Sequence, residues 1–170
     1  MKRWKKITLW TIGVLITLFI FFMVWYKQTY SMRIAGSYEV NDQTYQHHIL
    51  IATQGSDFKD SVVRAVVNGL KLKRMYIKVI DISALHQIIE EEWNVLIVLH
   101  TWEYSEPPQE ASDFVARVKD KSKLIVLCTS GAGNYKMEGV DGITSASQLS
   151  EVPLKVSEIL RQVNDLLNSK

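Results

Sequence analysis

Residues 48–70 read HILIATQGSDFKDSVVRAVVNGL, and this stretch decides the fold class. Its first five residues form a short apolar run rich in Ile and Leu, which is typical of a buried strand. The next four residues are small or polar and indicate a loop that ends at a helix N-cap, Ser56 or Asp57. Apolar residues then recur at helical spacing: Phe58, Val62, Val63, Val66, Val67 and Leu70. The stretch therefore predicts a strand, a loop and a helix.

The same alternation continues to the C-terminus. Further strands are expected at residues 75–82, 94–101, 123–129 and 140–145. Helical stretches are expected at 83–92, after Pro107 and Pro108, and at 154–167. Apolar strands that alternate with helices indicate a parallel sheet covered on both faces. The sequence predicts an α/β fold with a doubly wound five-stranded parallel sheet of order 2-1-3-4-5.

Three loops of this fold have the chemistry of a ligand site. In open parallel sheets a ligand binds beyond the carboxyl ends of the strands, where the strand order reverses. The first loop, residues 53–59, leads into a helix N-terminus and offers backbone N–H groups, hydroxyls and a lysine. The loop after the third strand carries Trp102 and Tyr104, and the loop after the fourth reads TSGAGNY from Thr129 to Tyr135. Together they predict a site for a planar, phosphorylated ligand.

These loops resemble those of a flavodoxin-like domain, and the resemblance covers residues 48–170. It implies FMN, with the phosphate on the first loop and the isoalloxazine ring between the other two. The phosphate contacts that it implies are Thr53, Gln54, Gly55, Ser56 and Lys59. The ring contacts that it implies are Thr101, Trp102, Glu103, Thr129, Gly131 and Tyr135.

The first loop departs from the family's T-x-T-G-x-T pattern. It keeps Gly55 but lacks two of the hydroxyls, and Asp57 places a carboxylate near the expected phosphate. Two functional classes therefore stay open. One is an electron-transfer module that holds FMN and serves a membrane redox partner. The other is a cofactor-free accessory or interaction subunit at the membrane.

Several other chemistries are disfavoured. A phosphoryl receiver needs an acidic residue after its third strand, where this chain has Thr101. No nucleophile elbow is followed by an acid and a histidine, so a hydrolase is not expected. Cys128 is the single cysteine, which excludes an intramolecular disulfide framework and a cysteine-built zinc site. Residues 48–170 carry 14 Lys/Arg against 16 Asp/Glu, which argues against nucleic-acid binding.

The N-terminus has the pattern of a membrane anchor. Residues 7–26 hold no charge and are long enough to cross a bilayer, with tryptophans near both ends. The run exceeds the apolar stretch of about 7–15 residues in a signal peptide, and no small-residue cleavage site follows it. Four basic residues precede the span and two follow, which predicts a cytoplasmic N-terminus and an extracytoplasmic body. We therefore expect an anchor over residues 1–26, a tether over 27–47 and the flavodoxin-like domain over 48–170 in a single-pass membrane protein.

Overall fold

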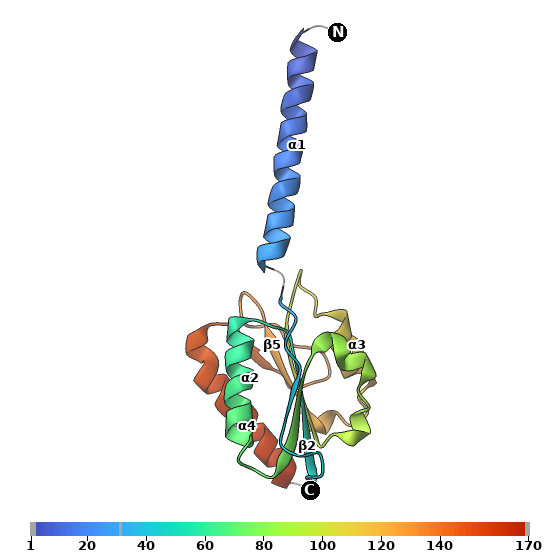
Figure 1. The fold of residues 1–170 in the computed structure, drawn as a ribbon, viewed down its shortest axis with the longest axis vertical. Coiled ribbons are helices and arrows are strands. Elements are labelled where there is room, and N and C mark those ends of the chain that lie inside the picture. The colour runs from blue at the N-terminus through green and yellow to red at the C-terminus, as the bar shows by residue number, and fades with distance from the viewer. Residues whose placement is uncertain (1–2, 31, 169–170) are drawn as a thin grey trace. The chain divides into compact units, whose positions relative to one another are not determined.

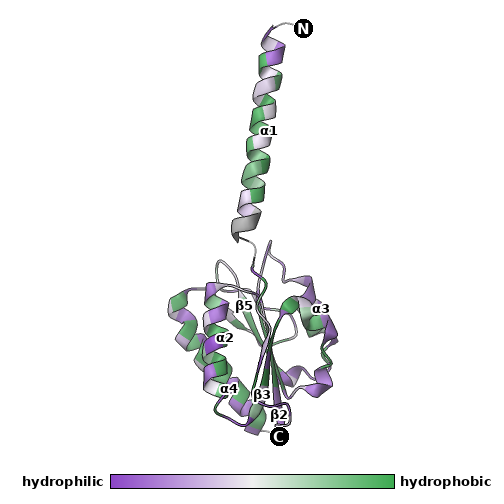
Figure 2. Ribbon diagram, viewed as in Figure 1, coloured by the Kyte–Doolittle hydropathy of each residue, from purple (hydrophilic) through white to green (hydrophobic). Residues whose placement is uncertain are grey.

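The computed structural model describes residues 3–30 and 32–168, which fall into two units divided between Met32 and Arg33. The first unit contains the helix α1 (Arg3–Tyr30). Its stretch Arg3–Tyr26 has a mean hydropathy of 2.5, and no part of that stretch is buried in the protein. By length and composition this helix is able to cross a membrane, although a signal sequence has the same features (Figure 2).

The second unit is an α/β domain (Figure 1). Its strands are β1 (Tyr38–Val40), β2 (His47–Thr53), β3 (Met75–Asp81), β4 (Val95–Thr101), β5 (Leu124–Thr129) and β6 (Ile143–Ser145). Its α-helices are α2 (Asp57–Leu70), α3 (Gln109–Arg117) and α4 (Val152–Asn168). Short 3₁₀ turns lie at Ile82–Gln87, Glu90–Glu92, Lys121–Lys123 and Leu149–Glu151.

Among the described residues, the strands form one sheet in the order β1-β3-β2-β4-β5-β6. The five strands β2 to β6 are parallel and repeat the expected 2-1-3-4-5 order, which confirms the doubly wound, flavodoxin-like α/β topology. The expectation of five strands was wrong, because β1 adds a sixth strand antiparallel to β3 at the edge. The sheet is therefore mixed rather than wholly parallel.

Each face of the sheet has its own apolar core. Helices α2 and α4 cover one face, where Ile51, Ile77 and Leu127 lie buried against Val62 and Ile159. Helix α3 and the 3₁₀ turn Ile82–Gln87 cover the other face. Strands buried on both sides explain the nearly continuous apolar runs in the sequence.

The helix expected at residues 83–92 is replaced by two 3₁₀ turns. The first turn begins at Asp81, whose carboxylate accepts the Ser83 N–H at 3.0 Å. It ends where Arg117 of α3 donates to the carbonyls of Leu85 and Ile88. These side-chain hydrogen bonds satisfy carbonyls that a continuing helix would have bonded internally.

Candidate functional site

The carboxyl ends of β2, β4 and β5 lie side by side, and the expected phosphate and ring residues meet there. The Thr101 N–H donates to the Gln54 side-chain oxygen at 2.7 Å. The Thr101 and Thr129 hydroxyl oxygens lie 2.8 Å apart. Lys59 donates from Nζ to the Thr101 hydroxyl at 2.6 Å. The polar groups that the sequence offered to a ligand thus bond to one another.

The first loop is closed by the chain's own backbone. The Gly55 N–H donates to the Arg33 carbonyl at 2.7 Å, and the Arg33 N–H donates to the Gly55 carbonyl at 3.0 Å. The Gln54 N–H donates to the Leu99 carbonyl at 3.2 Å. Ser56 serves as the N-cap of α2 and accepts the Lys59 N–H. Two backbone donors and a hydroxyl of this loop are therefore engaged within the protein.

Gly55 is required by this contact rather than by a ligand. A Cβ atom at residue 55 would lie 2.8 Å from the Arg33 carbonyl oxygen and 3.0 Å from the Arg33 Cβ. From the sequence, the phosphate of a cofactor was expected to contact Gly55, but the Arg33 backbone occupies that position. Arg33, 22 positions earlier in the chain, is the partner that the sequence reasoning missed.

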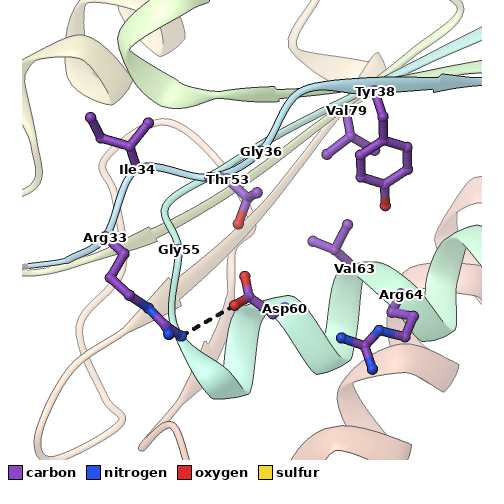
Figure 3. A pocket seen from close by; sticks show the side chains of 11 residues that line it. Arg33, Ile34, Gly36, Tyr38, Thr53, Gly55, Asp60, Val63, Arg64 and Val79 are labelled. Atoms are coloured by element: carbon purple, nitrogen blue, oxygen red, sulfur yellow. Dashed lines mark hydrogen bonds and ion pairs between the residues drawn. The ribbon is translucent and has the colours of Figure 1, made fainter.

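The charge at this loop is also balanced internally. Arg33 forms an ion pair with Asp57 at 2.6 Å. It forms a second ion pair with Asp60 at 3.3 Å (Figure 3). A dianionic phosphate at the start of α2 would have to compete with two carboxylates for this guanidinium. It would also find the N–H groups of Gln54 and Gly55 already donated. The first loop, as folded here, does not fit an FMN phosphate.

The two aromatic side chains contact each other. Trp102 and Tyr135 stack with ring centroids 5.0 Å apart and planes inclined by 19°. A planar ring inserted between them would need faces about 7 Å apart, twice the usual carbon contact distance. The loop between β4 and α3 folds back at Tyr104 and Ser105, which both have positive φ. The backbones of Glu103 and Glu106 form an antiparallel bridge across this turn. Glu103 and Gly131 are exposed. Because Trp102 and Tyr135 stack directly on each other, the folded structure leaves no space for a flavin ring between them.

A buried histidine lies under this edge. His100 is fully buried in β4, and its Nε2 lies 3.3 Å from the Cys128 Sγ. Burial lowers the pKa of His100 to about 4 and raises the pKa of the Cys128 thiol, so both side chains are neutral near pH 7. The described residues contain no cluster of three or more His, Cys, Asp or Glu side chains suited to a metal ion. The pair belongs to the core beneath the site.

Lys59 was expected to face a phosphate, but its side chain is 1 % exposed. Burial lowers the pKa of Lys59 from 10.5 to about 8, while Asp60 and Glu103 oppose that shift. The ammonium group bonds to Thr101 and lies near the Ser56 hydroxyl at 3.4 Å. Lys59 therefore ties α2 to the end of β4.

The buried lysine predicts a specific pH dependence. Its folded-state pKa lies below its unfolded value, so between about pH 8 and 10.5 the unfolded chain binds more protons. The free energy of unfolding should rise with pH across this window, by up to about 3 kcal/mol. Urea unfolding of the detergent-solubilised protein at pH 7.5 and pH 10 measures the rise. Lys59→Met should abolish it, whereas the exposed Lys71→Met should keep it; an unchanged rise in Lys59→Met would contradict this assignment.

Comparisons with known proteins give only remote likenesses. No family model and no curated protein matches the sequence. An oxidoreductase from Corynebacterium diphtheriae is similar in structure, with a TM-score of 0.49 and 10 % identity over 75 % of this chain and 100 % of that one. General stress protein 14 from Treponema denticola, solved in complex with FMN, has a TM-score of 0.31 and 12 % identity over 72 % of this chain and 96 % of its own. The response regulator domain of Thermotoga maritima CheB has a TM-score of 0.42 and 16 % identity, with the same coverage.

Proposed function

We propose that the protein is a membrane-anchored, flavodoxin-like accessory subunit that acts through protein contacts and does not hold FMN. The observation that carries this proposal is the reciprocal pair of hydrogen bonds between Arg33 and Gly55. It places the chain's own backbone on the loop where a flavodoxin-like domain would hold a phosphate. The ion pairs of Arg33 with Asp57 and Asp60 add to the stability of this arrangement.

The anchor in this proposal is α1. Its apolar length suits one bilayer crossing, and the basic residues before it favour a cytoplasmic N-terminus with the α/β domain on the other side. The partner is then another membrane protein or complex on the extracytoplasmic side. The near-neutral charge of the domain does not favour nucleic acid.

A second function is supported by a different observation. Trp102 and Tyr135 lie together at the switch point of the sheet, and Gly131 of the loop that carries Tyr135 is exposed. Aromatic side chains at this position suit a flavin ring, provided that Tyr135 turns away from Trp102. The alternative is therefore an FMN-binding electron-transfer module for a membrane redox partner. It also requires residue 33 to leave the first loop.

The flavin content of the purified protein separates the two functions. We expect the full chain in detergent to show no visible flavin absorption. We expect added FMN or riboflavin to keep its fluorescence at protein concentrations near 1 mM, because neither the phosphate cradle nor the ring slot is open. Stoichiometric FMN in the purified protein would contradict the accessory role. If that FMN were lost in Trp102→Ala but kept in the core-facing control Trp93→Phe, the electron-transfer function would replace it.

A further inference from the structure

A cavity of about 520 Å³ opens between α2 and the segment of residues 33–38 that crosses the sheet edge (Figure 3). The ends of β2 and β3 complete it, through Thr53 and Val79. Its volume lies within the range of about 300–1,000 Å³ that small-molecule sites occupy. The segment is fixed on the sheet by the Ala35 N–H, which donates to the Asp81 carboxylate at 2.7 Å. The cavity is therefore a formed feature of the α/β domain, and it shares Arg33, Thr53 and Gly55 with the closed first loop.

One wall of the cavity carries an acid and a base that do not pair. Asp60 and Arg64 are four residues apart on α2, the spacing at which opposite charges usually meet on a helix face. Among the described residues, the Arg64 guanidinium makes no hydrogen bond or ion pair. Asp60 accepts from Arg33 through Oδ2 at 3.3 Å, and its Oδ1 accepts no hydrogen bond from the described residues. Figure 3 shows Asp60 directed into the space between α2 and the segment, with Arg64 one turn further along the helix.

The rest of the lining contains both apolar side chains and the polar groups of Arg33 and Thr53. Val63 and Val79 are buried, and the ring of Tyr38 extends over α2 from the opposite side (Figure 3). The pKa of Tyr38 is raised, first by burial and also by Asp60, while Arg64 lowers it. The Tyr38 phenol is therefore a neutral hydroxyl that interacts electrostatically with both Asp60 and Arg64. The cavity combines the unpaired Arg64, the ion pair of Arg33 with Asp60, in which one Asp60 oxygen stays open, and apolar side chains.

We propose that this cavity binds a free α-amino acid with an apolar side chain. Its carboxylate would pair with Arg64, its ammonium group with the open oxygen of Asp60, and its side chain would lie against Tyr38, Val63 and Val79. An α-amino acid carries both charges on one carbon, so it matches an acid and a base on one turn of a helix. A simple carboxylate would leave the open oxygen of Asp60 unused, and a phosphate would face the Asp60 carboxylate.

Isothermal titration calorimetry of the full chain in detergent micelles tests this site, with L-leucine as the probe. L-leucine should bind with a stoichiometry of one. N-acetyl-L-leucine, which lacks the ammonium group, and L-leucinamide, which lacks the carboxylate, should each bind about tenfold more weakly or worse. Glycine, which has no side chain to bury, should also bind more weakly.

Variants locate the site on the protein. Asp60→Asn and Arg64→Gln should each weaken L-leucine binding about tenfold or more. The matched pair Asp165→Asn and Arg161→Gln on the exposed face of α4 should leave it unchanged. The proposal is overturned if neither L-leucine nor L-phenylalanine binds, or if the Asp60 and Arg64 variants bind like the α4 variants. It is also overturned if N-acetyl-L-leucine binds as tightly as L-leucine, a result that needs no variant to fold.

Discussion

Gly55→Val is expected to lower the free energy of unfolding of the α/β domain by about 3 kcal/mol. The new Cβ atom would lie 2.8 Å from the Arg33 carbonyl oxygen, which is a backbone atom and not the end of a flexible side chain. Residue 33 must then move away, and both hydrogen bonds between Arg33 and Gly55 are lost. Urea unfolding of the detergent-solubilised protein, followed by tryptophan fluorescence, measures the change.

Gly131→Val is the matched control for this substitution. Gly131 lies on the loop after β5, and a Cβ atom there would meet nothing within 4 Å. Its stability should change by less than about 0.5 kcal/mol, the usual range for exposed positions. Equal decreases in the free energy of unfolding of the two variants would show that valine on either loop is destabilising in itself. The contact between Gly55 and residue 33 would then not explain the effect.

The second large effect concerns α1. The double substitution Leu15→Arg and Leu18→Arg should prevent stable membrane integration of α1. Each arginine at the centre of a spanning helix costs about 3 kcal/mol relative to leucine. Both side chains are exposed on the apolar helix. Membrane fractions washed with alkaline carbonate should retain the unaltered protein at its full mass and lose the double variant. Together these results distinguish an anchor from a cleaved signal sequence.

The control for the helix is a second pair of exposed leucines. Leu72 and Leu149 lie on the surface of the α/β domain, and replacing both by Arg should leave the protein in the membrane fraction. A protein that lacks its first residues and appears in the soluble fraction would identify α1 as a signal sequence. In that case the protein would not be membrane-anchored, while the conclusion that the first loop is closed to an FMN phosphate would be unaffected.

The parallel strands were predictable because burial on both faces leaves a direct mark on the sequence. Strands β2, β4 and β5 each contain an unbroken apolar run, ILIA, VLIVL and LIVL. Their order followed from the topology that such strands adopt. Strand β1 left no such mark. It has three residues, its first two are exposed, and its pairing with β3 joins segments nearly forty residues apart. A short edge strand of this kind is set by tertiary contact, not by local pattern.

The location of the candidate site was predictable from the sequence, but the closure of its first loop by residue 33 was not. The three loops lie at one edge of the sheet, and Gln54 and Thr101 from separate predicted groups bond to each other there. The role of Arg33 was not readable, because nothing in a single sequence links a residue in an expected tether to a glycine 22 positions later. The burial of Lys59 was hidden for a similar reason: a lysine in the first turn of a helix usually faces solvent.

Amide hydrogen exchange at Gly55 and Arg33 tests the central claim most directly. Each N–H donates to the other residue's carbonyl, so both should exchange about 100-fold or more slowly than in an unstructured chain. Gly131, on the exposed loop after β5, provides the rapidly exchanging reference in the same sample. Protection of both amides in the full chain without added flavin is the result that the closed first loop predicts. Exchange of Gly55 as fast as Gly131, with protection appearing only when FMN is added, would contradict it.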